Sequence, residues 1–235
     1  MKIVVVIPTY NEAGSIGKVI NDVCLNCPDA EILVVDDNSP DETYKSVEIF
    51  VKANPKIHLL LRKENRGRGY AGIDGFKKAL SMDADFIVEM DGDGSHNPKY
   101  IANFLELANS SKCDAIIGSR YIDGGKDEER GFLRHFVSKS ARFYLSFVLG
   151  VNIKDPTSGF RMFKRKVLEA FVDELRSNDP FIVTEILYYL KKNNCVIKEY
   201  PIEFLSRFAG KSKLKIQTLI KYLFKVLKLK LSEKK

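Results

Sequence analysis

The sequence has 235 residues, 45% of them hydrophobic and 29% charged. This composition suits one folded domain with room for an extension, and it excludes an intrinsically disordered chain. The formal net charge is +7, but nine lysines and a single acidic residue lie between residues 210 and 235, so the rest of the chain is close to neutral. A basic surface spread over the whole fold, as a nucleic-acid partner would require, is therefore not expected.

Predicted strands and helices alternate through the first half of the chain. Five short apolar runs are predicted to be buried strands: residues 3–7, 31–35, 57–61, 86–90 and 115–118. The segments between them are predicted to be helices: residues 16–24, 41–51, 72–82 and 99–108. This alternation indicates an α/β fold with a mainly parallel sheet and helices on both faces.

After residue 118 the alternation ends. A charged loop is predicted over residues 123–130 and a long, phenylalanine-rich amphipathic helix over residues 132–149. The later segments are an extended stretch, two helices, a strand and a basic amphipathic helix, at residues 157–163, 166–175, 182–192, 196–204 and 216–231. We expect a globular domain over residues 1–214 and a basic helical extension over residues 215–235.

Three polar clusters directly follow predicted strands, at residues 8–12, 36–39 and 91–93. In an open parallel sheet, ligands bind beyond the carboxyl ends of the strands. The predicted topology therefore gathers the three clusters along one edge of the sheet, where a ligand site is expected.

Asp91 and Asp93 are the strongest chemical signal in the sequence. Two carboxylates at a strand end suit Mg²⁺ or Mn²⁺, because Mg²⁺ commonly binds one or two carboxylates together with substrate phosphates. Such an ion would neutralise a diphosphate leaving group. The alternative is a pair of solvated turn residues, and the apolar run just before the pair favours the metal site.

Two further segments have open interpretations. One residue of the pair Asp36 and Asp37 could cap the following helix, but a cap does not require two adjacent aspartates, and a carboxylate here could accept hydrogen bonds from a nucleotide base or ribose. In residues 66–69, two glycines precede a helix, so their backbone amides could meet a phosphate. A simple turn is an equal alternative there.

Several basic residues fall near the same predicted edge. Arg120 ends the fifth predicted strand, Arg134 opens the phenylalanine-rich helix, and Arg161 lies in the extended segment. A reaction between two phosphate-bearing substrates needs cations to offset their mutual repulsion. A further basic group consists of Arg207, Lys211 and Lys213.

The cysteines and histidines do not predict a metal site of their own. Cys24 and Cys27 form one C-x-x-C, but no second ligand pair for zinc is present. Reduced thiols in a cytosolic protein are expected. His58 and His135 are interpreted as structural, and His96, close behind the two aspartates, could support them.

In their order along the chain, these motifs resemble the family 2 glycosyltransferases of the GT-A fold. The resemblance lies in IPTYNE at residues 7–12, DDNSPD at 36–41 and MDGDGSHNP at 90–98. Three more motifs resemble the dolichol-phosphate mannose synthases and their polyprenyl-phosphate glycosyltransferase relatives: GSRY at 118–121, DPTSGFR at 155–161 and RFAGKSKL at 207–214. The resemblance covers the chain from Met1 to about Leu214.

The resemblance implies a nucleotide-diphosphate sugar as donor. Asp91 and Asp93 would hold the metal, Mg²⁺ or Mn²⁺, and with it the donor diphosphate. Arg207 and Lys213 would close over that diphosphate. The nucleoside would be held by Pro8, Tyr10, Glu12 and Asp37.

The resemblance also implies a polyprenyl or dolichyl phosphate as acceptor. Arg120 and Arg134 would bind the acceptor phosphate and stabilise charge during transfer. Ser212 would close over the donor diphosphate together with Arg207 and Lys213, and would also contact the acceptor phosphate. Glu185 matches an acidic position often found before the last helix of such domains, without an assigned role. Relatives often have alanine between the two aspartates and an apolar residue after them, where this chain has Gly92 and Gly94, which leaves the metal geometry open.

The expected reaction is an inverting transfer by single displacement, since no motif predicts a nucleophilic carboxylate. A phosphate acceptor is already anionic near pH 7, because its second pKa is about 6, so no strong general base is required. GDP-mannose is the expected donor, and UDP-glucose or another UDP-sugar is the alternative. Rival hypotheses are a sugar-nucleotide pyrophosphorylase, a hydroxyl acceptor, and a non-catalytic nucleotide- or lipid-binding subunit.

Two helices predict contact with a membrane surface. In residues 132–149, four phenylalanines fall on one helical face, and we expect part of that face to be exposed to lipid. Residues 216–231 combine a broad apolar face with a lysine-rich face, which is typical of an interfacial helix. No run reaches the roughly 18 apolar residues of a spanning helix, so we expect a peripheral protein at the cytoplasmic face of a membrane, held by lipid or by a membrane partner subunit.

Overall fold

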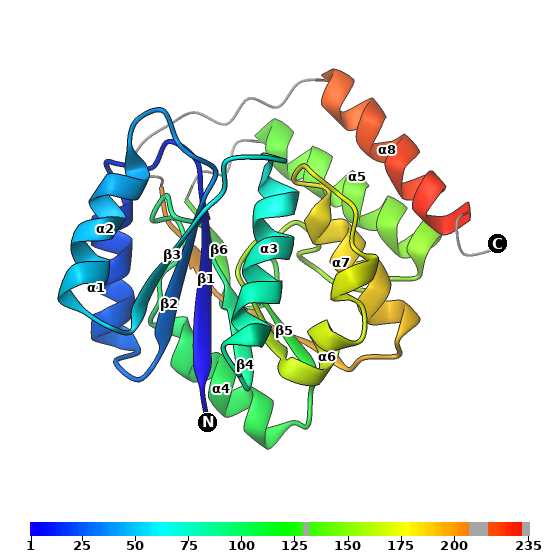
Figure 1. Ribbon diagram of the computed structural model, residues 1–235. Helices are drawn as coiled ribbons and strands as arrows, with labels where there is room; N and C mark the ends of the chain where they lie inside the picture. The colour runs from blue at the N-terminus through cyan, green and yellow to red at the C-terminus, as the bar shows by residue number, and fades with distance from the viewer. Residues whose placement is uncertain (129–131, 207–215, 232–235) are drawn as a thin grey trace.

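The computed structural model describes residues 1–128, 132–206 and 216–231, with the side chains of residues 132–139, 141 and 216–220 outside the description. Within these residues, seven strands form one sheet in the order β3-β2-β1-β4-β7-β5-β8, part of which faces the viewer in Figure 1. The strands are β1 (Ile3–Thr9), β2 (Glu31–Asp36), β3 (Ile57–Leu61), β4 (Phe86–Glu89), β5 (Ala115–Ser119), β7 (Arg161–Lys164) and β8 (Ile197–Pro201).

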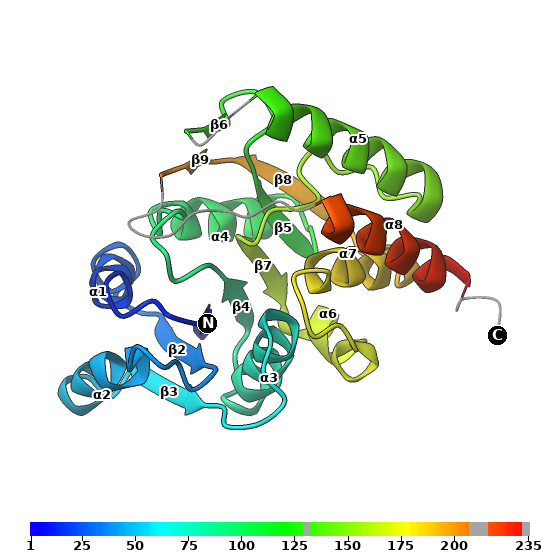
Figure 2. The same ribbon diagram turned by 90° about the horizontal axis from the view of Figure 1, so that it is seen from above.

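The sheet is mainly parallel, as predicted. Only β7 runs antiparallel to its neighbours, β4 and β5, whereas the other neighbouring strands pair in parallel. A second sheet of two short strands, β6 (Lys126–Asp127) and β9 (Glu203–Phe204), lies at the end of the molecule beside β8 (Figure 2).

Helices cover both faces of the large sheet and form two separate cores. Along β1, Val4 and Val6 face one core, while Val5 and Ile7 face the other, because successive side chains of a strand point to opposite faces. One face is covered by α1 (Ile16–Asn26), α2 (Thr43–Ala53) and α4 (Tyr100–Ser110). The other is covered by α3 (Arg68–Ser81), α5 (Phe132–Leu149), α6 (Arg165–Glu169), α7 (Ile182–Lys192) and α8 (Ile216–Leu231).

Several predicted elements differ from the structure, three of them for reasons that can be traced to packing or pairing. The helix predicted from residue 72 begins at Arg68, because the glycines that suggested a break are instead packed closely: a Cβ on Gly69 would lie 1.9 Å from the Ser177 carbonyl oxygen. The helix predicted over residues 166–175 divides into α6 and a short 3-10 helix, Val172–Glu174. The strand predicted over residues 196–204 divides after Pro201 into β8 and β9, which pair with different sheets.

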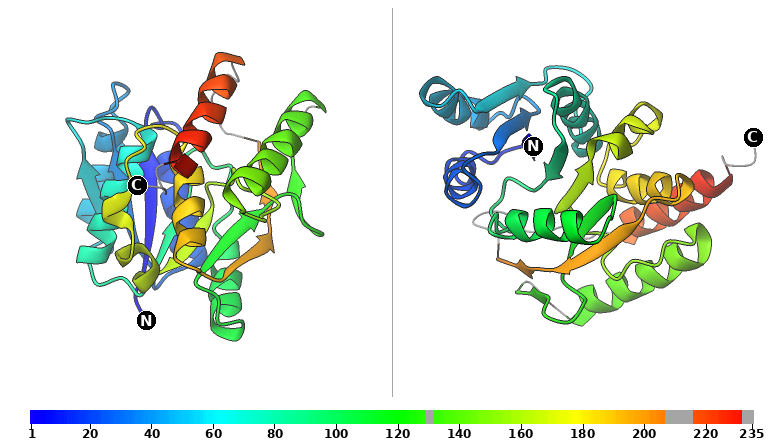
Figure 3. Two further views of the ribbon diagram at one scale, coloured as in Figure 1. Left: turned by 90° about the vertical axis from the view of Figure 1, so that its right-hand side faces the viewer. Right: turned by 90° about the horizontal axis from the view of Figure 1, so that it is seen from below.

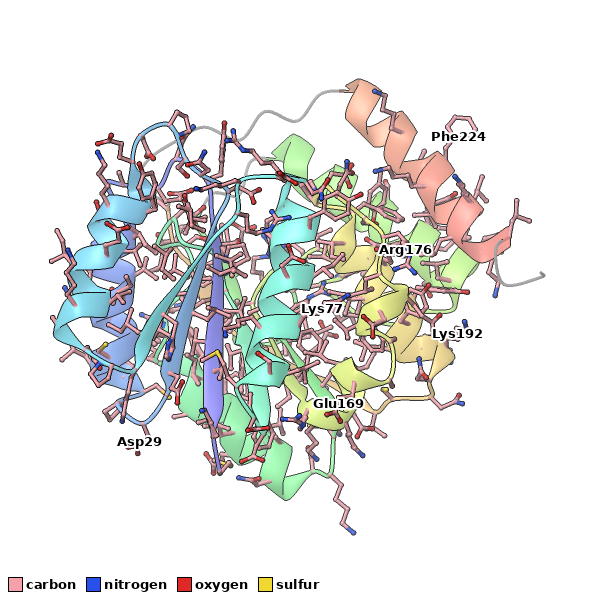
Figure 4. The ribbon with its side chains drawn as sticks, in the orientation of Figure 1. Asp29, Lys77, Glu169, Arg176, Lys192 and Phe224 are labelled. Atoms are coloured by element: carbon pink, nitrogen blue, oxygen red, sulfur yellow. The ribbon has the colours of Figure 1, made fainter. Side chains whose placement is uncertain are left out.

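The basic C-terminal helix α8 packs on the domain beside α5 (Figure 3). The Tyr144 hydroxyl of α5 donates to the Leu223 carbonyl at 3.0 Å, and Val226 is fully buried. On the outer side, Phe224 is 69% exposed and projects away from the molecule (Figure 4). The broad apolar face predicted for this helix is thus divided, because part of it packs inward and part faces solvent. No helix in the described residues is long and apolar enough to cross a bilayer.

Candidate active site

A cleft of about 660 Å³ opens at the carboxyl ends of β1, β2 and β4. This is the edge of the sheet where the sequence predicts a ligand site. The cleft brings together residues from three strand ends, from α3 and α7 and from the loops beside them. They are Pro8, Thr9, Tyr10, Glu12, Asp37, Arg66, Gly67, Arg68, Ala71, Asp91, Gly92, Asp93, Thr157, Gly159, Pro180 and Val183.

The predicted metal ligands Asp91 and Asp93 both line this cleft. Asp93 is buried and folds the turn after β4, since its Oδ1 accepts hydrogen bonds from the Ser95 N–H at 3.0 Å and the Ser95 hydroxyl at 2.6 Å. Asp91 is more open, and a Cβ on Gly159 would come within 3.2 Å of its carboxylate. The backbone opposite Asp91 thus leaves its oxygens room in the cleft.

Local backbone geometry favours glycine at two positions of this turn, Gly92 and Gly94. A Cβ on Gly92 would lie 2.9 Å from the Thr9 side chain, so the close approach of β1 and the turn favours glycine. Gly94 has φ +81°, which is the left-handed region that favours glycine. The departures from the usual family pattern therefore follow from the shape of the turn.

His96 supports the aspartate turn from behind. It is buried, with its ring 5.2 Å from the Phe160 ring and 5.4 Å from the Phe204 ring. The Asp91 N–H donates to His96 Nδ1 at 3.1 Å, which requires that nitrogen to be unprotonated. Burial lowers the pKa of His96 and outweighs the opposing effect of Asp91, so the imidazole is neutral and fixes the Asp91 backbone.

At the end of β2, the two adjacent aspartates Asp36 and Asp37 have different places. Asp36 is buried and closes the turn after β2 by accepting hydrogen bonds from the Thr9 and Ser39 hydroxyls at 2.9 and 2.7 Å. Asp37 lines the cleft. Its Oδ1 accepts from Arg62, and its Oδ2 accepts the Gly67 N–H at 2.7 Å. Asp37 therefore ties the end of β2 to the start of α3.

In the segment 66–69, Arg66 and Arg68 line the cleft, while the amides of both glycines are engaged within the protein. The Gly67 N–H is taken by Asp37, and the Gly69 N–H donates to the Asn178 carbonyl at 3.1 Å. In contrast, Arg68 lines the cleft and lies between two carboxylates. Its Nη1 is 2.8 Å from Glu89 Oε1 and its Nη2 is 3.5 Å from Asp91 Oδ1.

Arg120, predicted to bind the acceptor phosphate, is held by the buried Asp155. Its Nε and Nη2 lie 2.7 and 2.8 Å from the two Asp155 oxygens, and Nη2 also donates to the Thr157 hydroxyl at 2.9 Å. Burial alone would lower the pKa of Arg120, but its hydrogen bonds and charge pairing with Asp155 raise it. Because Thr157 lines the cleft, this arginine lies just behind the cleft wall.

Arg161 stabilises the fold through hydrogen bonds to backbone carbonyls. It is fully buried, and its three guanidinium nitrogens donate to the carbonyls of Ser158, Val183 and Pro156 at 2.7, 2.7 and 3.0 Å. These bonds hold the turn before β7 against α7. The arginine considered as a site cation in the sequence therefore has its donors directed at backbone, away from any ligand.

Glu185 has a structural role that its sequence position did not reveal. Its side chain is buried and accepts hydrogen bonds from the backbone N–H of Arg176 at 3.0 Å and of Ser177 at 2.9 Å. The loop it holds presses on the two glycines at the start of α3, since a Cβ on Gly67 would lie 2.2 Å from the Asn178 carbonyl oxygen. Glu185 thus shapes the cleft from a distance.

Of the other predicted site residues, some line the cleft and some lie outside the described residues. Pro8, Tyr10 and Glu12 line the cleft, and Glu12 Oε2 accepts from the Ser15 hydroxyl at 2.8 Å. Arg134 belongs to α5, but its side chain is outside the description. The remaining predicted ligands lie outside the described residues: Arg207, Ser212 and Lys213.

Among the described residues, no group of three or more His, Cys, Asp or Glu forms a closed metal site. The pair Asp91 and Asp93 instead suits a cation that takes its remaining ligands from substrate phosphates and water, as Mg²⁺ commonly does.

Comparison with known proteins gives consistent matches. The model of glycosyl transferase family 2 matches residues 4–172. The polyprenol monophosphomannose synthase of Mycolicibacterium smegmatis is 35% identical over 94% of this chain and 84% of its own length. The undecaprenyl-phosphate mannosyltransferase of Micrococcus luteus is 34% identical over 91% of this chain and 88% of its own length. The dolichol-phosphate mannosyltransferase of Pyrococcus furiosus is 37% identical over 95% of this chain, which spans only 62% of that protein.

A solved structure with the same fold is glucosyl-3-phosphoglycerate synthase from Mycobacterium tuberculosis, crystallised with Mn²⁺, UDP and glucosyl-3-phosphoglycerate. Its TM-score is 0.70 at 18% identity, over 98% of this chain and 79% of that one. At this identity the likeness concerns the fold alone.

Proposed function

The chain belongs to glycosyl transferase family 2, and we propose that it transfers a sugar from a nucleotide-diphosphate donor to a polyprenyl phosphate at a membrane surface. The observation that carries the proposal is the pair Asp91 and Asp93 in a cleft at the carboxyl ends of parallel strands. The lipid-phosphate mannosyltransferases among the relatives support a polyprenyl phosphate acceptor. The expected donor is GDP-mannose, from which mannose would be transferred, and UDP-glucose is the alternative donor.

The donor would lie across the strand ends. Pro8, Tyr10, Glu12 and Asp37 would hold the nucleoside, while Asp91 and Asp93 would hold Mg²⁺ or Mn²⁺ and the diphosphate. When bound, such an ion offsets the charge that develops on the leaving diphosphate. His96 and Gly159 contribute by fixing the Asp91 backbone and by leaving space at its carboxylate.

The acceptor would approach from the side of Arg120 and α5. Its phosphate oxygen would attack the anomeric carbon in a single displacement with inversion, and the bond from that carbon to the donor's phosphate oxygen would break. An anionic acceptor needs orientation and charge stabilisation more than a general base. In the structure the buried acid Glu185 is committed to the backbone of Arg176 and Ser177, which fits this requirement.

The outer faces of α5 and α8 would meet the membrane. Phe143 and Phe147, four residues apart on α5, are 75% and 83% exposed, and Phe224 is exposed on α8, the helix that packs beside α5. Lys221 and Lys228 of α8 are also exposed. Aromatic side chains with flanking lysines suit an anionic lipid surface. We place this surface at the cytoplasmic face, with a membrane partner subunit as the alternative occupant.

The proposal is tested by incubating the full chain with radiolabelled GDP-mannose, Mn²⁺ and vesicles containing a polyprenyl phosphate. Label should move into the lipid phase, and EDTA should abolish the transfer. Parallel reactions with UDP-glucose identify the donor. Release of free sugar without any lipid product, with either donor, would contradict the assignment.

A further inference from the structure

Glu89 is a carboxylate buried in the middle of the sheet, two residues before the proposed metal ligand Asp91. It is fully buried, and its Oε2 is the one buried side-chain nitrogen or oxygen atom in the described residues without a hydrogen-bond partner. A buried carboxylate is strongly disfavoured unless a cation accompanies it. Glu89 therefore requires a compensating cation beside it, beneath the cleft.

The cation that is hydrogen-bonded to Glu89 is Arg68, although the charge of the buried Arg161 also acts on this carboxylate. Arg161 faces Glu89 in the pairing of β4 with β7, but it gives its three guanidinium nitrogens to backbone carbonyls. Arg68, by contrast, donates from Nη1 to Glu89 Oε1 at 2.8 Å. Burial alone would lower the pKa of Arg68, but the charges of Glu89 and Asp91 raise it, so Arg68 stays protonated.

A glycine on α3 makes room for this ion pair. Gly72 lies one helical turn after Arg68, and a Cβ there would be 3.2 Å from both Arg68 Nη1 and Glu89 Oε1. Such a distance is tighter than ordinary van der Waals contact, so a side chain would push the pair apart. The pair is thus fitted to its place by two elements, β4 and the first two turns of α3.

The outer nitrogen of the same guanidinium reaches the metal site. Arg68 Nη2 is 3.5 Å from Asp91 Oδ1, and Arg68 lines the cleft with Asp91 and Asp93. A divalent cation bound by Asp91 would compete with Arg68 for the same carboxylate. Once it is displaced from Asp91, Arg68 remains anchored through Nη1 to Glu89, with Nη2 still in the cleft.

We propose that Arg68 is an additional cation of the donor site, which neutralises Asp91 before the metal binds and contacts the donor diphosphate afterwards, with Glu89 as its anchor. The inference rests on the proposed function. In sugar transfer, the bond between the anomeric carbon and the diphosphate oxygen breaks and its electron pair stays on the oxygen. The leaving diphosphate therefore gains negative charge, which a guanidinium stabilises through charge-assisted hydrogen bonds.

The test compares binding of Mn²⁺ alone with binding of a nucleoside diphosphate in the presence of Mn²⁺, both by calorimetry on the full chain. Arg68→Met should bind Mn²⁺ alone more tightly, by about tenfold, because a competing charge is gone, and should bind GDP with Mn²⁺ more weakly, by about tenfold or more. If GDP does not bind the unmodified protein, UDP is used. Lys63→Gln, an exposed neighbour outside the cleft, is the matched control and should behave as the unmodified protein.

A second variant guards against loss of folding. Arg68→Met leaves the buried Glu89 without its hydrogen-bonded cation, whereas Arg68→Met combined with Glu89→Gln removes both charges of the pair together. The double variant should show the same opposite changes in Mn²⁺ and diphosphate affinity. Unchanged affinities, or affinities that fall in parallel, would overturn the inference. If the unmodified protein binds neither GDP nor UDP, the proposed function itself fails; if it binds one and the double variant matches it, only the role of Arg68 fails.

Discussion

The two sides of the proposed active site are built in different ways. On the proposed donor side, Asp36, Asp37 and Asp93 lie at the ends of parallel strands and are held by hydrogen bonds to a neighbouring strand, to the start of α3 and within a turn, respectively. On the proposed acceptor side, α5 and α8 lie side by side (Figure 3), and both carry exposed aromatic side chains, including Phe143 and Phe224. A site of fixed polar geometry suits a small, charged donor, whereas an exposed apolar surface suits an acceptor that stays in a membrane.

Removal of a carboxylate from the proposed donor side should lower activity more than any other change. Asp91→Asn and Asp93→Asn should each lower kcat/KM by at least about 1000-fold, since several kcal/mol of charge stabilisation by a metal is lost. Melting temperatures should stay within a few degrees of the unmodified protein, because asparagine keeps the shape. Asp29→Asn, at an exposed turn far from the cleft (Figure 4), is the control. A variant that keeps a tenth of the activity would show that this carboxylate is not needed.

The Arg120–Asp155 pair should show the next largest effect, on stability. Arg120→Met leaves the buried Asp155 without its ion-pair partner, which should cost about 3–5 kcal/mol of unfolding free energy. Arg120→Met with Asp155→Asn should recover most of that loss. If Arg120 also serves the acceptor, the double variant will fold and bind nucleotide but not transfer sugar to lipid. Full transfer by the double variant would limit Arg120 to a structural role.

Glu185 should affect the donor side more modestly. Glu185→Gln replaces an acceptor of two backbone N–H groups with a neutral amide, which should cost about 1–3 kcal/mol. Because the loop presses on Gly67 and Gly69, the KM for the donor should rise. Glu169→Gln, which breaks only an exposed ion pair with Arg165, should change neither quantity. Equal effects of the two variants would show that Glu185 does not shape the donor side of the cleft.

The smallest expected effects belong to the membrane surface. Lys221→Gln with Lys228→Gln should weaken binding to anionic vesicles by about 1 kcal/mol per lysine, and the loss should vanish at high salt. Phe143→Ser with Phe147→Ser should weaken binding at both salt concentrations. Lys45→Gln, an exposed lysine on α2, is the control in the same flotation assay. Variants that float as well as the unmodified protein would point to a protein partner instead.

The sequence predicted where the cleft lies, for a physical reason. Apolar runs followed by polar residues indicate strand ends, and parallel topology places such ends together, so Asp37, Asp91 and Asp93 were expected at the edge where they line the cleft. Their roles toward a donor stay a prediction. Glu89 was missed because it was counted within an apolar run, although a charged residue in a buried strand is itself a signal of an internal pair. Its partner Arg68 could not be found, since their contact depends on how α3 packs against β4.

Other differences have the same origin in tertiary contact. Arg161 looked like a site cation in the sequence, but the packing of the turn before β7 against α7 directs its donors to carbonyls. Part of the predicted apolar stripe of α8 is buried at Val226 because α5 and α7 cover it, and Phe224 is left outside. Helical periodicity identifies an apolar face but does not say which portion a neighbouring helix will cover.

One measurement tests the division between the two sides most directly. Sugar transfer is measured for Phe143→Ser with Phe147→Ser, once with a long polyprenyl phosphate in vesicles and once with a short, water-soluble isoprenyl phosphate. We predict that the variant loses activity on the vesicle-bound acceptor and keeps it on the soluble one, whereas Asp91→Asn loses both. An equal loss by the phenylalanine variant on both acceptors would contradict the account, because the aromatic face would then serve the chemistry or the fold and not the membrane.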